Sequence, residues 1–256
     1  MAMRKKFLVS LFVVGVMFSG IALAKERPLK VFILAGQSNM VGAAANVSDL
    51  PEDLKGDQKM ALFFDGIKWG VLAPGKTEMM GFGPEISFSL KLSTELKEPV
   101  GIIKHSVAGS NLAHHWSPAN SKSLYTKLSK KVKAAQQMRR IEMVGMIWMQ
   151  GESDSRDKNM AEDYSKNLAD FIQTLRKDFK SPAMFFVAGR VNPPKDRFPH
   201  VDIVRKAQEE CKMPGFAFVD CDTLEKTRDR LHYNTRGLVD MGHRFADAML
   251  MFMQKK

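Results

Sequence analysis

Short apolar runs and longer stretches of helical periodicity follow one another along the chain. The apolar runs are rich in β-branched and aromatic residues and predict strands over 29–35, 100–104, 143–149, 183–188 and 216–220. Apolar residues at helical spacing predict helices over 84–97, 121–140, 160–178, 201–211 and 236–253. Near-continuous apolar strands joined by helices are typical of a parallel sheet covered on both faces. We therefore predict an α/β protein with a three-layer α/β/α architecture and a five-stranded parallel sheet. A short hairpin is expected over 61–69, near the rim of the candidate active site.

The first 24 residues have the pattern of a cleavable signal peptide. A basic start is followed by the mostly apolar stretch 7–21 and by the small-residue pattern Ala22-Leu23-Ala24. We expect cleavage after Ala24 and export to the periplasm or the medium, with an uncleaved N-terminal anchor as the alternative. Residues 25–256 are expected to form a single domain, and no later apolar run approaches the roughly 20 residues that span a bilayer. Stable membrane insertion after cleavage is therefore not expected.

The charge of the chain narrows the choice of partner. The formal net charge is +11, and segment 121–140 carries seven Lys and Arg residues without an acid. Because its apolar residues recur at helical spacing, the basic residues are expected to form a solvated helix face. The alternative is that these basic residues attract the protein to an anionic polysaccharide or surface. Nucleic acid is not expected as a partner, since no basic motif interleaved with aromatic residues is present; the oligomeric state is left open.

The cysteines and histidines give no sign of a metal site. Cys211 and Cys221 are the two cysteines, and both a disulfide bridge between them and two free thiols are compatible with the sequence. Neither has a histidine at ligand spacing, and His114 and His115 are adjacent instead of one helical turn apart. We therefore expect no metal and no other cofactor.

Three residues have the chemistry of a serine hydrolase. Ser38 directly follows the first apolar strand in Gly36-Gln37-Ser38-Asn39-Met40, and Asp229 and His232 precede the last predicted helix. Nucleophilic attack by a hydroxyl at neutral pH requires a base that takes its proton and a carboxylate that orients the base. In open α/β sheets, functional groups gather beyond the carboxyl ends of the strands. The G-x-S-x-G elbow of α/β-hydrolases is absent because position 40 is Met.

Two further motifs fall at the same edge of the predicted sheet. Segment 106–111 follows the second strand, and Gln150-Gly151-Glu152-Ser153-Asp154 follows the third. With the segments around Ser38 and His232, these blocks resemble the SGNH-type hydrolases, in the branch that contains sialate O-acetylesterases and the acetylxylan esterases of carbohydrate esterase family six. The Trp-x-Gln-Gly-Glu block is the most specific of the four. The sequence departs from the family pattern at Ala108-Gly109-Ser110, where Gly-Gly-Thr is usual, and at Met149, where His is common.

The resemblance implies an SGNH-hydrolase, flavodoxin-like fold and a serine esterase, which the signal-peptide pattern predicts to be exported. The expected activity is removal of O-acetyl groups from an acetylated polysaccharide or sialic acid, through an acyl-enzyme on Ser38. His232 would act as general base and then acid, and Asp229 would orient it. The oxyanion would be stabilised by the backbone N–H groups of Ser38 and Gly109 and by the side-chain amide of Gln150.

Two further residues are expected to stabilise the loops of the site, and three are expected to contact the substrate. Glu152 and Asp154 would satisfy backbone donors around the loop. His115 and Trp116 would line the acyl or sugar pocket, with rim packing as the alternative for Trp116. Arg190 would meet a substrate hydroxyl or carboxylate, with a structural ion pair as the alternative.

Two other functions compete with the acetylesterase. A lipase or thioesterase of the same chemistry would need a groove for a longer acyl chain, and no apolar insertion or amphipathic lid is visible in the sequence. A non-catalytic carbohydrate-binding module would not need the complete set of catalytic side chains. The sequence alone names neither the sugar nor the position of the ester.

Overall fold

The computed structural model describes residues 27–78 and 81–254, so the predicted signal peptide over 1–24 lies outside the described residues. Within them, seven strands form one sheet in the order β3-β2-β4-β1-β5-β6-β7. The strands are β1 (Leu29–Gly36), β2 (Gln58–Phe64), β3 (Trp69–Leu72), β4 (Val100–Ser106), β5 (Ile141–Met149), β6 (Phe185–Arg190) and β7 (Phe216–Asp220). Neighbouring strands are parallel except β2 and β3, which form an antiparallel pair.

The five predicted strands are confirmed, but the number of strands is larger than predicted. Segment 61–69 was expected only as a rim hairpin, whereas β2 pairs in parallel with β4 through the register Ala61↔Val100 and belongs to the main sheet. The physical reason is burial, because Ala61 and Phe64 are fully enclosed and need a neighbouring strand and helix to cover them.

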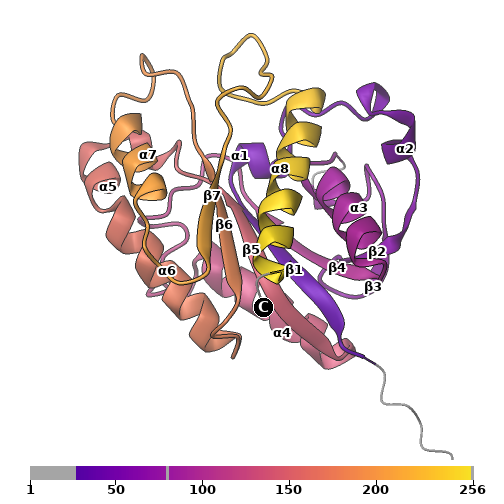
Figure 1. The fold of residues 1–256 in the computed structure, drawn as a ribbon. Helices are drawn as coiled ribbons and strands as arrows, with labels where there is room; N and C mark the ends of the chain where they lie inside the picture. Colours follow the sequence, from indigo (N-terminus) through magenta and orange to yellow (C-terminus); the bar gives the residue numbers. More distant parts are fainter. Residues whose placement is uncertain (1–26, 79–80, 255–256) are drawn as a thin grey trace, which may run out of the picture.

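Helices cover both faces of the sheet (Figure 1). The longer ones are α3 (Glu85–Leu96), α4 (Leu124–Met138), α6 (Tyr164–Asp178), α7 (Val201–Glu209) and α8 (Thr235–Gln254), and the shorter ones are α1 (Ser38–Val41), α2 (Glu52–Lys55) and α5 (Lys158–Glu162), with single 3₁₀ turns at Val47–Asp49 and Asp154–Arg156. Helices α3 and α8 pack against each other on one face.

Two consecutive residues of β6 show that the sheet is a middle layer. The ring of Phe185 stacks on Phe252 of α8, whereas the ring of Phe186 contacts Phe171 of α6. Successive side chains of a strand point to opposite faces. Helices α6 and α8 therefore lie on opposite faces of the sheet, and the predicted α/β/α layering is confirmed.

The end of the central strand β1 is fixed by a close backbone approach. Gly36, its last residue, pairs with Ser106 of β4 on one side and with Met149 of β5 on the other. Gly36 has φ of +150°, and a Cβ atom there would lie 2.0 Å from the carbonyl oxygen of Met149. Only glycine fits at this position. The turn after β1 is thereby held against the ends of both neighbouring strands.

A buried ion pair lies beneath that turn. Lys104 of β4 donates to Glu85 of α3 at 2.8 Å, and both side chains are fully buried. The ammonium also donates to the carbonyl of Val41, and Glu85 accepts the N–H of Gly83 and the hydroxyl of Thr77. These extra hydrogen bonds satisfy the groups that would otherwise make burial of two charges costly. The pair connects β4 and α3 to the C-terminal end of α1.

We expect the loss of either partner of this pair to destabilise the fold strongly. Glu85→Gln or Lys104→Met should each lower the free energy of unfolding by about 3–5 kcal/mol, because the remaining charge or polar group is left buried without its partner. The double variant should lose less than the sum of the two. Urea denaturation of the variants measures these values, and Asp170→Asn, which breaks the exposed Lys166–Asp170 pair, should change stability by less than about 1 kcal/mol. Single-variant losses as small as that control would contradict the role of the buried pair.

Candidate active site

Ser38 lies on the turn that follows the central strand. It is the first residue of α1, its side chain is almost buried, and the preceding residue Gln37 donates its N–H to the carbonyl of Met149. Helix α1 ends after a single turn at Gly42, whose φ of +88° lets the chain turn away. The hydroxyl is therefore presented at the carboxyl edge of the sheet by a short and rigid turn.

The structure brings Ser38 together with the two residues predicted as its partners. The Nε2 atom of His232 lies 3.1 Å from the Ser38 hydroxyl, and the Nδ1 atom lies 2.6 Å from Oδ2 of Asp229. A carboxylate accepts the Nδ1 proton, so this contact selects the tautomer with an unprotonated Nε2 facing the hydroxyl. The three groups form a continuous line of hydrogen bonds.

Asp229 is held as a charged acceptor by its own loop. Its Oδ1 atom accepts the N–H groups of Leu231 and His232 and the hydroxyl of Thr227, at 2.7–2.9 Å. Burial by itself raises the pKa of this carboxyl, but the hydrogen bonds outweigh it and hold the pKa below the ordinary value. The carboxylate is therefore ionised when His232 takes up a proton.

The side-chain amide of Asn39 connects the turn that carries Ser38 to the loop that carries His232. Its Oδ1 accepts the N–H of Tyr233 at 3.2 Å, and its Nδ2 donates to the carbonyl of Leu231 at 3.3 Å. These contacts flank His232 on both sides in the sequence. Asn39 stands directly after the predicted nucleophile, yet no role was predicted for it, because sequence position does not show what an amide contacts.

Beneath the site, two buried carboxylates accept hydrogen bonds from the surrounding loops. Glu152 accepts the second Asn39 N–H at 2.7 Å, and Asp154 accepts the backbone N–H groups of Leu112 and Ala113. Burial raises the pKa of both carboxyls, and the hydrogen bonds offset this only in part. Asp154 does satisfy backbone donors as predicted, whereas Glu152 acts on the amide of Asn39.

Gln150 does not reach the pocket as an oxyanion donor in this structure. It is fully buried, and its Nε2 lies 2.6 Å from Asp154, 3.1 Å from the carbonyl of Ser110 and 3.3 Å from Oε1 of Gln37. An amide nitrogen carries two protons, so these acceptors use its full capacity. Gln150 thus joins the loop after β4 to the loop after β5.

The predicted backbone donors remain available. Within the described residues, neither the N–H of Ser38 nor that of Gly109 donates a hydrogen bond to another protein atom. Gly109 has φ of +71°, and the space around its missing Cβ is open. The turn therefore exposes its amide edge at the pocket without a side chain in the way.

The start of this loop is held by Glu78. One of its oxygens accepts both the N–H and the hydroxyl of Ser106, at 2.8 and 2.7 Å. Burial alone raises the pKa of Glu78, but the hydrogen bond with His105 and the charge of Lys131 lower it to about 2. A charged acceptor thus fixes the strand end from which Gly109 projects.

Asn111 is a pocket residue for which no role was predicted. It lines the same pocket as Ser38 and His232, and its side-chain carbonyl accepts the N–H groups of His114 and His115 at 2.9 and 3.1 Å. Since the oxygen faces those backbone groups, the amide N–H groups point away from them. In the part of the chain that the structure describes, they donate to no protein atom.

Two of the three predicted substrate contacts are wrong, and the third lies outside the pocket wall. Trp116 is fully buried among Trp148 and Phe171, and its indole N–H donates to Ser110; no face of the ring is free to stack on a sugar. Arg190 is held by the carboxylates of Glu209, Asp220 and Asp222. His115 is exposed but accepts the N–H of Asn111 and is not among the pocket-lining residues.

The remaining groups considered from the sequence play no part in this site. Cys211 and Cys221 are free thiols, so the bridge left open above is not formed. Across residues 27–78 and 81–254, no cluster of three or more His, Cys, Asp and Glu side chains could hold a metal ion. Over the same ranges, no helix has both the length and the apolar character needed to cross a bilayer.

The triad opens into a pocket of about 430 Å³. This volume is in the range of small-molecule sites. The pocket is lined by Gln37, Ser38, Ala108, Gly109, Asn111, Ser153, Arg156, Asp157, Met160, Phe198, Leu231 and His232.

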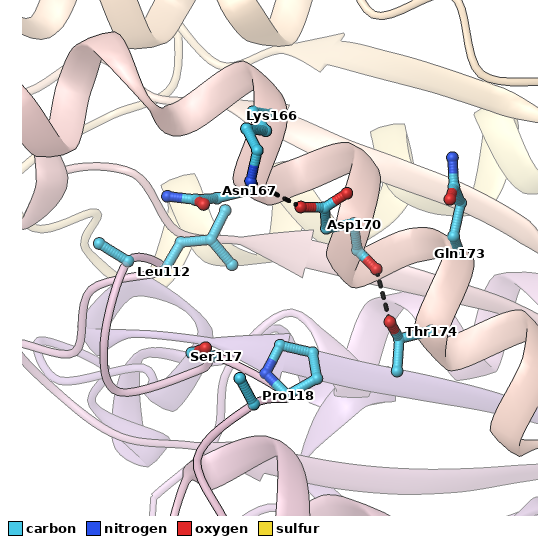
Figure 2. Close-up of a pocket in the computed structure, with 10 residues that line it drawn as sticks. Leu112, Ser117, Pro118, Lys166, Asn167, Asp170, Gln173 and Thr174 are labelled. Atoms are coloured by element: carbon cyan, nitrogen blue, oxygen red, sulfur yellow. Dashed lines mark hydrogen bonds and ion pairs between the residues drawn. The ribbon is translucent and has the colours of Figure 1, made fainter.

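A second hollow of similar size, about 410 Å³, begins at Leu112 and extends over one face of α6 (Figure 2). Figure 2 shows Lys166 paired with Asp170, and the Thr174 hydroxyl donating to the carbonyl of Asp170. None of its lining residues is a histidine, so it lacks a base beside a hydroxyl. The chemistry therefore belongs to the pocket at Ser38.

Comparisons with known proteins agree with this chemistry. Residues 28–251 match the family described as carbohydrate esterase, sialic acid-specific acetylesterase. A probable carbohydrate esterase of Arabidopsis thaliana is 26% identical over 246 residues, which cover 87% of this chain and 91% of the relative.

Solved structures show the same fold. A protein from Arabidopsis thaliana has a TM-score of 0.77 at 24% identity, covering 88% of this chain and 99% of that chain. NanS has a TM-score of 0.69 at 15% identity, covering 90% and 98%. A carbohydrate acetylesterase from Xanthomonas citri has a TM-score of 0.68 at 20% identity, covering 88% of this chain and 57% of that chain.

The chain belongs to the carbohydrate esterase family of sialic acid-specific acetylesterases, since the match extends over nearly all described residues. It is therefore a carboxylic ester hydrolase that deacetylates carbohydrates. The predicted resemblance to this branch of the SGNH-type hydrolases is confirmed.

We expect Asn39 to control the position of the base. Asn39→Ala should lower kcat about tenfold to a hundredfold with little change in KM, because the loop around His232 loses its link to the nucleophile turn and small misplacements of reacting groups are costly. Steady-state hydrolysis of an acetyl ester measures both constants. Asn167→Ala, in the second hollow, is the matched control and should keep wild-type values. An unchanged kcat in Asn39→Ala would show that the loop holds His232 without this amide.

Proposed function

We propose that the protein is an exported serine esterase that removes O-acetyl groups from carbohydrate through an acyl-enzyme on Ser38. The observation that carries this proposal is the line of hydrogen bonds from Asp229 through His232 to Ser38, at 2.6 and 3.1 Å, at the wall of the pocket. Export is supported by the signal-peptide pattern of residues 1–24.

In the first half of the reaction, Ser38 becomes acylated. Its Oγ attacks the carbonyl carbon of the acetyl group while its proton passes to Nε2 of His232. The carbonyl electrons move onto the oxygen and then return as the bond to the sugar oxygen breaks. That oxygen takes the proton from Nε2 and leaves as a sugar hydroxyl. Asp229 stabilises the imidazolium between these two proton transfers.

The negative charge on the tetrahedral oxygen requires donors that are already in place. Among the described residues, the backbone N–H groups of Ser38 and Gly109 are unoccupied donors at this pocket. We assign the third position to the side-chain amide of Asn111, whose oxygen is held by backbone N–H groups and whose N–H groups are free within the described chain. Gln150 supports this oxyanion site indirectly, because its amide donates a hydrogen bond to the carbonyl of Ser110 in the same loop.

In the second half, water releases acetate. The water gives a proton to Nε2 of His232 and attacks the acetyl carbon of the acyl-enzyme. Collapse of this second tetrahedral intermediate breaks the bond to Oγ, which recovers the proton from Nε2. The enzyme returns to its starting state, and one water is consumed for each acetate released.

The competing functions fit the site less well. A non-catalytic binding module would have no use for a hydroxyl, imidazole and carboxylate aligned at hydrogen-bonding distance. A lipase-like enzyme would need an extended apolar groove, whereas the pocket wall includes polar and charged residues, among them Asn111, Ser153 and Arg156. The family match also favours a carbohydrate ester.

We expect each member of the triad to be essential for turnover. Ser38→Ala or His232→Ala should lower kcat by about 10⁴-fold or more, because the acyl-enzyme can no longer form at a useful rate. Asp229→Asn should also reduce kcat, by up to about 10⁴-fold, since the imidazole is then held in the wrong tautomer. Release of acetate from an acetylated sugar measures turnover, and circular dichroism confirms that the variants are folded. Near-normal turnover in a folded Ser38→Ala protein would refute the mechanism.

The assignment of Asn111 as an oxyanion donor is tested by a substitution that removes its amide N–H groups but keeps its hydrogen bonds within the loop after β4. Asn111→Asp preserves the acceptor for the N–H groups of His114 and His115 but removes the amide donor. It should lower kcat by about 10²–10³-fold with little change in KM, because the lost hydrogen bond forms fully only in the transition state. Gln150→Ala should instead lower the thermal unfolding temperature together with kcat. Wild-type kcat in Asn111→Asp would show that the amide of Asn111 is not the third donor.

A further inference from the structure

The pocket at Ser38 and the second hollow follow each other between the same two segments of the chain. These segments are the loop between β4 and α4 and the stretch from the end of β5 to the end of α6. The pocket at Ser38 is lined by the loop up to Asn111 and by the stretch up to Met160. The second hollow is lined by the loop from Leu112 onward and by α6 from Lys166 onward. Because neighbouring Cα atoms are about 3.8 Å apart, the loop passes from one hollow to the other within one residue.

Buried contacts connect the two walls of the second hollow. Asp154 accepts the backbone N–H groups of Leu112 and Ala113, which both line it. The indole of Trp116 packs against the ring of Phe171 of α6, with 6.1 Å between the centroids. Both rings are fully buried, and each directly adjoins a lining residue in the chain. The hollow is therefore preformed, as binding sites for small molecules usually are.

The lining of the second hollow combines uncharged polar groups with an apolar surface. Figure 2 shows Asn167 on α6 and Leu112 and Pro118 on the loop that faces it. In the described part of the chain, the side chains of Asn167, Gln173 and Ser117 donate to no other protein atom. Amides and hydroxyls can both donate and accept hydrogen bonds, as the hydroxyl groups of a sugar do. Leu112 and Pro118 offer apolar surface for the C–H groups of a sugar ring.

The charges in the second hollow cancel each other. Lys166 donates to Asp170 at 3.1 Å, so the cation and the anion of the lining form a pair. The hydroxyl of Thr174 is bound to the carbonyl of Asp170. The hollow therefore offers hydrogen bonds without net charge, which suits a neutral, hydroxyl-rich ligand better than an ion.

We propose that the second hollow binds a neighbouring sugar unit of the glycan whose acetylated unit lies in the pocket at Ser38, so that the enzyme prefers acetylated oligosaccharides or polysaccharides to acetylated monosaccharides. This inference rests on the proposed function, since it concerns the length of the carbohydrate that Ser38 deacetylates. A glycan laid along the shared walls passes from Asn111 to Leu112 and meets the uncommitted amide of Asn167. The hollow takes no part in the chemistry and adds binding energy for the longer substrate.

The test compares substrates that differ in the number of sugar units. O-acetylated xylose is paired with O-acetylated xylotriose, and O-acetylated N-acetylneuraminic acid with its O-acetylated trimer, each with one acetyl group on the same hydroxyl. p-Nitrophenyl acetate carries no sugar and reaches only the pocket at Ser38, so it reports on the catalytic groups alone. Acetate release is measured with wild type, the double variant Asn167→Ala/Gln173→Ala and Ala119→Trp. Gln137→Ala is the matched control, because Gln137 is an exposed amide on α4 that lines neither hollow.

For at least one pair, wild type should show a kcat/KM for the trimer about fivefold to fiftyfold above that for the single sugar, as expected for two or three hydrogen bonds between uncharged groups. The difference should lie in KM. The double variant should reduce this advantage by about threefold or more, and Ala119→Trp should abolish it, because the indole would occupy the hollow. Each variant should change kcat/KM for p-nitrophenyl acetate by less than about twofold. Added salt should leave the advantage of xylotriose unchanged, since neither the ligand nor the hollow carries net charge.

Three results would overturn the assignment of the second hollow. Wild type could show equal kcat/KM for the single sugar and the trimer in both pairs, or both hollow variants could keep an advantage that wild type shows. Equal losses on all substrates, p-nitrophenyl acetate included, would mean that the hollow supports the fold and not the glycan. If wild type released acetate from p-nitrophenyl acetate in a Ser38-dependent way but from none of the four sugars, the failure would be that of the proposed function on which the subsite rests.

Discussion

The side-chain amide of Asn39 joins two loops that lie 192 residues apart in the chain, and the geometry of the site depends on this contact. The amide oxygen accepts the N–H of Tyr233, and the amide nitrogen donates to the carbonyl of Leu231 and to the carboxylate of Glu152. Since an amide has distinct donor and acceptor ends, these three contacts fix its orientation. Ser38 and His232 are thus held relative to each other by the residue that follows Ser38.

Beneath that amide, the end of the sheet is unusually polar for a protein interior. Gln150, Glu152 and Asp154 are all buried, and each has a hydrogen-bond partner in the loop after β1 or the loop after β4. A buried polar group is tolerated only when it is hydrogen-bonded, so these contacts specify one arrangement of the loops. One oxygen of Glu152 has no partner among the described residues, which agrees with the raised pKa of this carboxyl.

Across the pocket, the charges are distributed unevenly. The triad side carries the carboxylate of Asp229, whose charge is directed at His232 and its own backbone. Arg156 lines the same pocket, with its guanidinium over the ring of Phe198.

Much of this architecture follows from the sequence, and the triad does so most clearly. Ser38 directly follows an apolar strand, Asp229 and His232 share one short loop, and parallel strands bring their carboxyl ends to one edge whatever the details of packing. The strand positions were predictable for a similar reason, since apolar runs must be buried. The edge strands β2 and β3 were only partly predictable, because their place in the sheet depends on pairing with β4.

What only the tertiary structure decided was the direction of individual polar side chains. The sequence placed Gln150 at the functional edge, but its amide turns inward to Asp154 and Ser110, while Asn111 takes the pocket wall. Trp116 and Arg190 were expected at the substrate, yet one is enclosed by aromatic rings and the other by three carboxylates. A hydrogen bond or an ion pair depends on a partner within about 3–4 Å, and which groups come that close is set by the packing of segments far apart in the chain.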